Sequence, residues 1–570
     1  MTASIAEEHI KTDDGLALAR RAGAARQYGF IGLVYIIATL LTSAHFMADT
    51  VDYVESVLKS VEFWEFGHLF WRPLGWLLYQ VSEPLTRAVA GPDPVANVAL
   101  VFVATNWVAG LMSALLIYGL LKRITKHEWA ARLSTLAFAL SHGFLNFAQT
   151  GSSYIPGLAF LLLGLFILAK NEERPDRQLR SAMAAGAALA CSVCFWFLYV
   201  WAIPGALALP FLLFGAQPSR RRLVIRTAIV FAAAAGLAYG AVLAHLGIYN
   251  VAGLRAWVSS SSHGMTHVNG VTRVAFGVPR SLIDMGNDGV ALKRFMLGDR
   301  FNPVSLPEVI LLSLWGLALF YACGAVVAFN LLRSKWGKRV LLYLLAGSLP
   351  MIAFAAFFDG AAIERYLPIY PFLFIALSCF LAGKRAALSA KVAVLLLIAV
   401  TSGANVIRMS KPVLAHEQEL VAARIAELRP RLKSESVIVT IDLQDALINF
   451  RRSFPFDPLV QQTQARITSL VMIGTERLPA WTSEFAEEAT STWGRGGEVW
   501  VTARALSPRP REEWNWVEGA DRRISWDDFY SFFSTLQTGE SAGGEDGFVL
   551  LMPSPNNRRA LAALIAGDRP

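Results

Sequence analysis

Long runs of apolar residues, separated by charged and polar segments, recur between positions 28 and 407 of the chain. A helix that crosses a bilayer needs about 20 apolar residues, and eleven runs meet or approach this length. They cover Tyr28–Phe46, Val95–Leu121, Leu133–Phe147, Tyr154–Ala169, Ser181–Tyr199, Ile203–Phe214, Thr227–Ile248, Ile310–Leu332, Val340–Phe358, Leu367–Leu381 and Val392–Ile407. The fifth and sixth runs are short and meet near Pro204, so we expect a bent pair there, its broken backbone covered by protein.

The pattern changes after Ile407. A helix is predicted over Val413–Leu432, followed by a β-branched run at Val437–Ile441. Further strand-like runs cover Leu470–Ile473, Val499–Ala503 and Phe548–Met552, with helical stretches between them. This alternation predicts a small α/β domain. We therefore expect an N-terminal tail (1–27), an all-α polytopic membrane domain (28–407) and a C-terminal α/β domain (408–570).

Composition and charge support this division. Hydrophobic residues make up 55% of the chain and charged residues 17%, which is too apolar for several water-facing domains. All four cysteines lie inside apolar runs, so a secreted disulfide framework is excluded. The net charge is +9, but the residues from Arg408 onward carry 19 basic and 22 acidic side chains. The positive charge therefore belongs to the membrane part and gives no indication of a nucleic-acid partner.

Basic residues between the apolar runs predict the orientation of the chain. With eleven spans, six basic clusters fall on one side of the membrane, which identifies that side as cytoplasmic. They are the clusters at 20–26, 122–132, 170–180, 220–226, 333–339 and 384–391. The N-terminus is then cytoplasmic, and loops 48–94 and 249–305 and the C-terminal domain are extracytoplasmic. We expect a multi-pass protein of the bacterial cytoplasmic membrane, with the first run as a retained anchor.

The first external loop begins with an amphipathic pattern. Val54, Val57, Leu58 and Val61 recur at steps of three or four residues, and charged residues occupy the opposite side. This pattern predicts a helix in the plane of the membrane interface. Aromatic residues between 63 and 79 follow it, and aromatic side chains favour the headgroup zone.

Two aspartates stand at the start of this helix. Asp49 and Asp52 are three residues apart, which is typical of a capping pair at a helix N-terminus. The same position suits a carboxylate that acts as a general base on an acceptor hydroxyl at the membrane surface. The two interpretations are compatible, because a cap also fixes a carboxylate in place.

Two further clusters of polar residues are predicted on the outer face. Arg72 lies among aromatic residues, where an unpartnered cation is costly, so it either grips a lipid phosphate or extends to the headgroups. His68, close by, is a weaker candidate and suits a structural role. Glu364, Arg365 and Tyr366 form the turn between the ninth and tenth runs. There the two charges either pair with each other, or Arg365 joins Arg72 around a phosphate while Tyr366 donates a hydrogen bond.

No metal site or cofactor is predicted. His263 and His267 are four residues apart, but no carboxylate stands at matching spacing. A divalent metal ion is left open, although no residue pattern supports one. The sequence also has no Gly-rich phosphate loop ahead of a helix, so a nucleotide site is not expected.

The chain resembles the GT-C class of integral membrane glycosyltransferases, and among them the protein O-mannosyltransferases and aminoarabinose transferases. The resemblance covers residues 28–407. It rests on the acidic pair after the first run, the aromatic-Arg-Pro-Leu segment, Tyr-Ile-Pro-Gly at 154–157 and Glu-Arg-Tyr-Leu-Pro-Ile-Tyr-Pro at 364–371.

The resemblance implies transfer of a sugar from a polyprenyl-phosphate donor to a hydroxyl of a glycan, lipid or protein outside the cytoplasm. Asp49 or Asp52 would be the catalytic base, and Arg72, Arg365 and His68 would bind the donor phosphate. Glu364 and Tyr366 would bind the acceptor or another part of the substrate. A single displacement would invert the anomeric centre.

Two other functions stay open. A transporter or flippase for a lipid-linked molecule would place ionisable groups in mid-membrane, and no Asp, Glu, Lys or Arg lies inside a predicted span. A non-catalytic, glycan-binding scaffold would use tryptophans of the C-terminal domain, although core packing explains these residues equally well.

Overall fold

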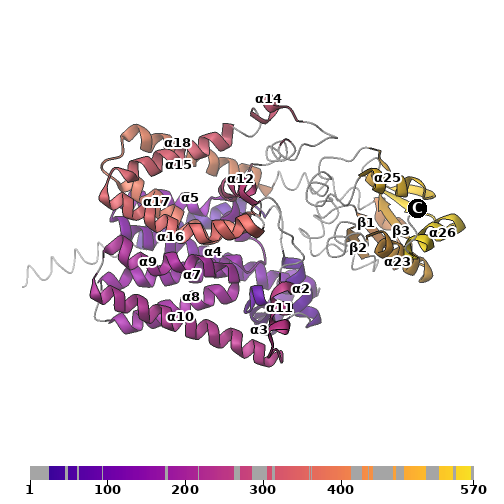
Figure 1. Ribbon diagram of the computed structural model, residues 1–570, viewed down its shortest axis with the longest axis horizontal. Coiled ribbons are helices and arrows are strands. Elements are labelled where there is room, and N and C mark those ends of the chain that lie inside the picture. Colours follow the sequence, from indigo (N-terminus) through magenta and orange to yellow (C-terminus); the bar gives the residue numbers. More distant parts are fainter. Residues whose placement is uncertain are drawn as a thin grey trace, which may run out of the picture.

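Apolar helices build most of the molecule, as the sequence predicts, and a small sheet forms the C-terminal domain (Figure 1). The computed structural model describes residues 25–44, 49–60, 63–92, 94–173, 177–215, 217–261, 270–285, 295, 304–310, 315–358, 360, 362–411, 427–433, 435–440, 466–469, 481–508, 526–542 and 547–566. Most of the predicted helix Val413–Leu432 and the run Leu470–Ile473 fall outside these residues.

Seven of the described helical segments are long and apolar enough to cross a membrane, so the chain is an integral membrane protein. They are Pro94–Thr125 (α4), Gln178–Phe195 (α8), Phe197–Phe214 (η4 and α9), Pro218–His245 (α10), Lys335–Phe358 (α16), Ile363–Ala382 (η6 and α17) and Leu388–Arg408 (α18). Three shorter apolar helices are Ala25–Leu41, Tyr154–Lys170 (α7) and Leu317–Leu332, which lies within Trp315–Leu332 (α15).

The third predicted span, Leu133–Phe147, does not form a single helix, so this prediction is wrong. Glu128–Ala139 (α5) and His142–Phe147 (α6) are separate helices, because the backbone of Ser141 is extended. The Ser141 hydroxyl donates a 2.7 Å hydrogen bond to the Phe138 carbonyl. Serine competes with the helix for backbone groups in this way, which explains the break.

The bent pair expected near Pro204 is also wrong. The chain breaks at Trp196, whose backbone is extended, and an 18-residue helical segment lies on each side. Pro204 instead lies in the first turn of Ile203–Phe214 (α9), where the missing N–H costs no hydrogen bond. Each of the two segments is therefore an independent candidate for a span.

Most of the core lies among the membrane helices. A single large cluster of buried apolar residues joins the first helix to α4, α5, α7, α8, α9, α16 and α17. At one end of the bundle, a group of helices that are not among these spans packs together (Figure 1). It contains Thr50–Lys59 (α2), Phe66–His68 (η1), Trp71–Ala90 (α3) and Val251–Ser260 (α11).

The predicted external loops contact each other within this group. The Gly67 N–H donates to Ser261 Oγ over 3.1 Å, and Trp257 Nε1 donates to the Trp64 carbonyl over 2.8 Å. Segments 63–67 and 257–261 therefore lie on the same side of the bundle. Helix Gly270–Leu282 (α12) lies further along the second loop, and helix Leu306–Val309 (α14) follows directly after it.

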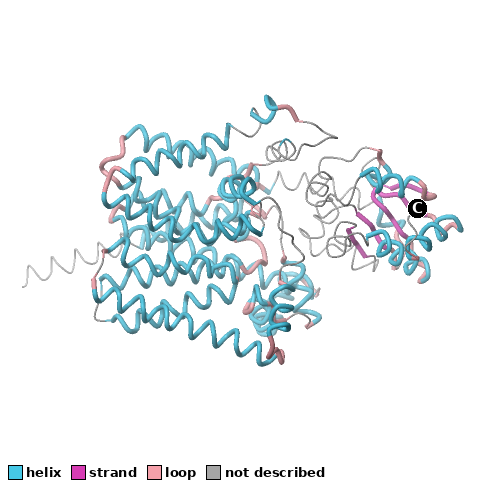
Figure 2. Tube along the Cα trace, viewed as in Figure 1, coloured by secondary structure: helices cyan, strands magenta, loops and turns pink. Residues whose placement is uncertain are grey.

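The C-terminal domain is α/β, as predicted. Its sheet has the order β2-β1-β3-β5-β4, and the strands lie together at one end of the molecule (Figure 2). The strands are Val437–Thr440 (β1), Arg466–Ser469 (β2), Val499–Thr502 (β3), Thr538–Ala542 (β4) and Phe548–Leu551 (β5). β1 pairs in parallel with β2 and β3, whereas β5 runs antiparallel to β3 and β4.

Apolar side chains cover both faces of this sheet. Val437, Val439, Val499 and Val501 pack on one face with Trp481–Gly494 (α23), Trp526–Ser534 (α25) and Pro555–Ile565 (α26), whereas Ile438 and Trp500 pack on the other. Trp493 is buried in the first of these clusters, which confirms core packing for this tryptophan. The edge strand β4 was not predicted, because its sequence Thr-Gly-Glu-Ser-Ala is almost wholly polar and exposed.

Candidate active site

The predicted interfacial helix is present as α2, and it packs against α3 and α4. Tyr53, Val54 and Val57 are buried in a cluster with Trp71 and other apolar residues of α3 and α4. Asp52 and Lys59 are exposed, as the amphipathic pattern predicts, but Leu58 is exposed as well. Packing of α2 on one face fixes the position of the residue that precedes it, Asp49.

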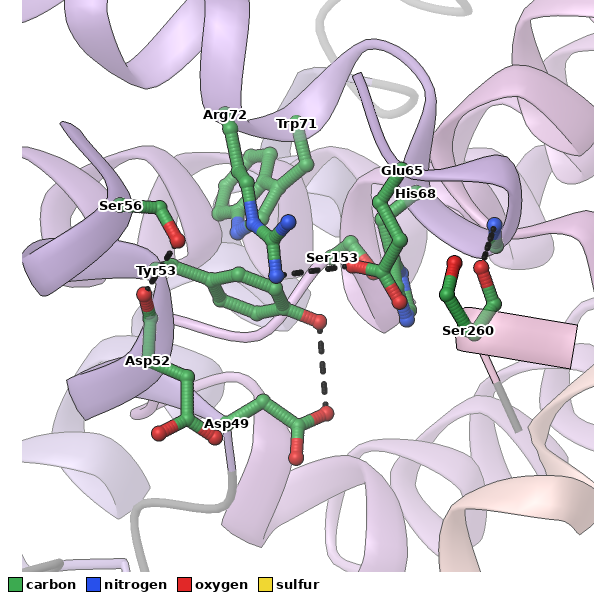
Figure 3. Close-up of polar contacts among 12 residues, drawn as sticks. Asp49, Asp52, Tyr53, Ser56, Glu65, His68, Trp71, Arg72, Ser153 and Ser260 are labelled. Carbon is green, nitrogen blue, oxygen red and sulfur yellow. Dashed lines mark hydrogen bonds and ion pairs between the residues drawn. The ribbon is translucent and has the colours of Figure 1, made fainter. Parts of the chain in front are cut away.

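Asp49 does not cap the helix through its side chain. It occupies the N-cap position of α2 without a side-chain capping hydrogen bond. Its Oδ2 instead accepts a hydrogen bond from Tyr154 Oη at 2.6 Å. It also accepts one from Tyr53 Oη at 3.3 Å (Figure 3). Asp49 is half-buried, whereas Asp52 is exposed. The structure therefore separates two aspartates that the sequence treats alike.

The hydroxyl of Tyr53 is held as a donor. Tyr53 is 1% exposed, and burial raises the pKa of its phenol well above the ordinary value. The neighbouring carboxylates of Asp49 and Glu65 raise this pKa further. A raised pKa keeps the phenol protonated at neutral pH, so Tyr53 donates to Asp49 rather than repelling it.

Arg72 forms an ion pair with Glu65 that was not predicted from the sequence. Its Nη2 lies 2.9 Å from Glu65 Oε2, and the two side chains are only 2% and 7% exposed. The guanidinium also lies over the Tyr53 ring, with Cζ 5.4 Å from the ring centroid (Figure 3). The predicted snorkelling arginine is therefore wrong, because Arg72 is buried beside a carboxylate. Phosphate binding by Arg72 stays a prediction.

The segment before α7 joins α2 and α3 to the bundle. Ser153 Oγ lies 2.5 Å from Nδ1 of the buried His68. Gly151 accepts a 2.8 Å hydrogen bond from Trp71 Nε1 through its carbonyl, and its N–H donates to Thr50 Oγ1 over 2.9 Å. Residues of α2, η1 and α3 are thus all hydrogen-bonded to positions 151–153.

Gly151 leaves no room for a side chain. A Cβ at this position would lie 2.5 Å from Thr50 Cγ2 and 2.9 Å from Phe102 Cβ. We expect Gly151→Ala to destabilise the fold by about 1–3 kcal/mol, because overpacking must shift the start of α2. The thermal unfolding midpoint of the purified protein measures this loss.

Gly236→Ala is the matched control. Gly236 is in the middle of α10, and nothing lies within 4 Å of a Cβ placed there. This change should leave the midpoint unchanged or raise it, since alanine favours the helix more than glycine does. Equal midpoints for the two variants would contradict the tight packing around Gly151.

The turn at 364–366 is part of Ile363–Ile369 (η6), which packs against the start of α7. Arg365 is 6% exposed, and its Cζ lies 4.5 Å from the centroid of the Phe358 ring. The Tyr366 hydroxyl donates a 2.6 Å hydrogen bond to the Gly360 carbonyl. The Glu364 carboxylate is near enough to interact electrostatically with Tyr154.

Of the predicted site residues, Asp49, His68 and Arg72 contact Tyr53 or Tyr154. Asp52 lies on the exposed face of α2. In the described part of the chain, no group of three or more His, Cys, Asp or Glu residues could hold a metal ion. His263 and His267 lie outside the described residues.

Four residues of the site were not predicted: Tyr53, Glu65, Ser153 and Tyr154. Tyr154 belongs to the Tyr-Ile-Pro-Gly segment on which the resemblance rests, but its contact with Asp49 joins positions 105 residues apart. Glu65 could have been predicted from the sequence, because a buried arginine among aromatic residues requires a nearby carboxylate as its partner.

Neither a protein-family model nor a curated protein sequence matches the chain. Solved structures similar to it include the apo form of ArnT from Cupriavidus metallidurans, with 11% identity, a TM-score of 0.49 and coverage of 95% of this chain and 99% of that one. ArnT bound to undecaprenyl phosphate has 12% identity, a TM-score of 0.46 and coverage of 94% and 99%.

The oligosaccharyltransferase of Archaeoglobus fulgidus has 13% identity, a TM-score of 0.46 and coverage of 85% of this chain and 69% of that one. These proteins are GT-C glycosyltransferases, the class that the sequence resembles.

Proposed function

We propose that this protein is a membrane glycosyltransferase that moves a sugar from a polyprenyl-phosphate donor to an acceptor hydroxyl. Asp49 acts as the general base. The acceptor is a glycan, lipid or protein on the extracytoplasmic face. The observation that carries the proposal is the placement of Asp49, which accepts two tyrosine hydrogen bonds instead of capping α2.

The environment of Asp49 suits a base. Its Oδ2 is oriented by Tyr154 and Tyr53, and two hydroxyl donors fix a carboxylate without neutralising its charge. A carboxylate has more acceptor sites than these two bonds occupy, so it retains the capacity to receive a proton. General bases held in this way contribute about 10²- to 10⁴-fold to a rate.

The donor in this proposal is already activated, because its leaving group is a phosphate ester. The protein must align the acceptor oxygen behind the anomeric carbon, remove its proton late, and stabilise the departing phosphate. Arg72 and Arg365 are the proposed partners of that phosphate. A single displacement of this kind inverts the anomeric centre.

Donor cleavage by the purified full-length protein tests the proposal. The protein is placed in lipid nanodiscs with a panel of synthetic undecaprenyl-phosphate monosaccharides and an envelope extract as acceptor. Mass spectrometry should detect undecaprenyl phosphate and a glycosylated acceptor for at least one donor. Absence of cleavage for the whole panel would contradict the proposal. In sealed vesicles, movement of intact donor across the bilayer without cleavage would favour a transporter instead.

A further inference from the structure

Tyr154, the first residue of α7, joins the membrane bundle to Asp49. Its Oη donates the shorter of the two hydrogen bonds that Asp49 Oδ2 accepts, at 2.6 Å against 3.3 Å from Tyr53. Tyr154 is 5% exposed, and its ring centroid lies 4.5 Å from that of Trp196 and 5.0 Å from that of Phe147. The position of the Asp49 carboxylate therefore depends on where α7 places Tyr154.

The start of α7 needs an anchor from outside the helix. Ser153 occupies its N-cap position without a side-chain capping hydrogen bond. Helix ends fray when their terminal groups are not held. Tyr154 follows directly, and its hydroxyl lies at the far end of a long side chain. A small shift of the helix start would therefore become a larger shift at Asp49.

Two side chains near the break between α8 and Phe197–Ala202 (η4) supply this anchor. Tyr199 Oη donates a 2.6 Å hydrogen bond to the Tyr154 carbonyl. Ser192 Oγ donates a 2.8 Å hydrogen bond to the Gly157 carbonyl. Both donors are fully buried. The first turn of α7 is thus fastened to the neighbouring helices through its carbonyl groups.

Gly157 allows the Tyr199 ring to reach α7. A Cβ at position 157 would lie 2.4 Å from Tyr199 Cε2, which is closer than two carbon atoms can approach. Any larger residue there would push the ring away from the helix. The Tyr-Ile-Pro-Gly segment at 154–157 therefore contains both the residue that holds Asp49 and the small residue that admits Tyr199.

We propose that Tyr199 is a positioning residue for sugar transfer, acting through Tyr154 on the Asp49 carboxylate. The inference rests on the proposed function, in which Asp49 is the general base. A catalytic group must be held near its productive geometry by residues that are themselves fixed by packing and hydrogen bonds. An error of about 1 Å in its placement can cost about 100-fold in rate. Tyr199 need not contact the substrate to have this effect.

The test begins with Tyr199→Phe, which keeps the ring and removes only the hydroxyl. With the donor that the panel experiment identifies and the hydroxyl acceptor, we expect kcat to fall about 10-fold and the KM for the donor to stay within about twofold. Tyr154→Phe removes the bond to Asp49 itself and should cost about 10- to 100-fold. The double variant should be no slower than Tyr154→Phe, because both changes act on the same carboxylate.

Azide as the acceptor separates positioning from packing. As an anion it needs no general base, so Asp49→Ala should transfer the sugar to azide. Adding Tyr199→Phe to Asp49→Ala should leave the rate of azide transfer unchanged, since the carboxylate on which Tyr199 acts is absent. A loss with azide as large as the loss with the hydroxyl acceptor would overturn the inference, because Tyr199 would then support the whole site. Additive losses in Tyr154→Phe/Tyr199→Phe would overturn it as well.

Tyr35→Phe is the matched control. The Tyr35 side chain is also fully buried, and its Oη donates a 2.9 Å hydrogen bond to a backbone carbonyl, that of Trp107. Loss of a buried hydrogen bond should lower the thermal unfolding midpoint of both variants, but only Tyr199→Phe should lower kcat. Equal losses of kcat in the two variants would contradict a specific role for Tyr199.

Asp49→Asn distinguishes failure of this inference from failure of the proposed function. If Asp49→Asn abolishes transfer while Tyr199→Phe keeps the wild-type kcat, only the role of Tyr199 is wrong. If Asp49→Asn transfers sugar normally, the proposed base is wrong, and Tyr199 has no catalytic carboxylate to position.

Discussion

Replacing Asp49 with asparagine is expected to lower sugar transfer at least about 100-fold, whereas Asp52→Asn should retain most of the activity. Asparagine keeps a side-chain oxygen for the hydrogen bonds from Tyr154 and Tyr53 but cannot accept a proton. A loss of this size matches removal of a general base. The rate of undecaprenyl phosphate release, measured at saturating donor, gives the comparison.

Asp52→Asn is a well-matched control, because the same substitution is made three residues away on the same helix. Asp52 is exposed, so its replacement should leave the thermal unfolding midpoint unchanged. Normal transfer by Asp49→Asn, together with loss of transfer in Asp52→Asn, would reverse the assignment. Normal transfer by both variants would favour a scaffold without this chemistry.

A substitution that removes either partner of the Glu65–Arg72 ion pair is expected to produce the largest loss of stability. Glu65→Gln leaves a buried guanidinium without its carboxylate, and Arg72→Gln leaves a buried carboxylate without its cation. Removal of one partner from a buried pair typically costs about 3–5 kcal/mol. We expect either variant to show a markedly lower thermal unfolding midpoint in detergent and a lower yield of folded protein in membranes.

The double variant Glu65→Leu/Arg72→Met separates stability from phosphate binding. Apolar residues of similar volume often replace a buried ion pair at little cost, so the midpoint should largely recover. If Arg72 also holds the donor phosphate, the double variant should fold but transfer sugar poorly and with a raised KM for the donor. Recovery of both the unfolding midpoint and the KM for the donor would show that the pair is purely structural and that Arg72 does not bind the donor.

Much of the membrane domain is predictable from the sequence, since spans depend on local composition. Ten of the eleven apolar runs correspond to described apolar helices, and the runs at Val437, Val499 and Phe548 are strands. The predictions that fail do so for local reasons that hydropathy does not show. Ser141 diverts a backbone hydrogen bond and breaks the third run, and the polar strand β4 is specified only by its pairing with β5.

The candidate site was predictable in part. Asp49, His68 and Arg72 stand close together in the sequence and in space, so a short segment identified them. The choice between Asp49 and Asp52 depends on Tyr154, a residue of α7, and no local pattern contains that contact. The same holds for Ser153, whose position beside His68 requires α7 to meet η1.

Transfer to azide by Asp49→Ala would test the central claim most directly, because azide is already an anion and needs no base to remove a proton. The account predicts that this variant fails with the hydroxyl acceptor but converts the donor to a glycosyl azide of inverted configuration, releasing undecaprenyl phosphate. Nuclear magnetic resonance of the product gives its configuration. A folded Asp49→Ala protein that transfers to the hydroxyl acceptor at the wild-type rate, or that fails with azide as well, would contradict a general base at Asp49.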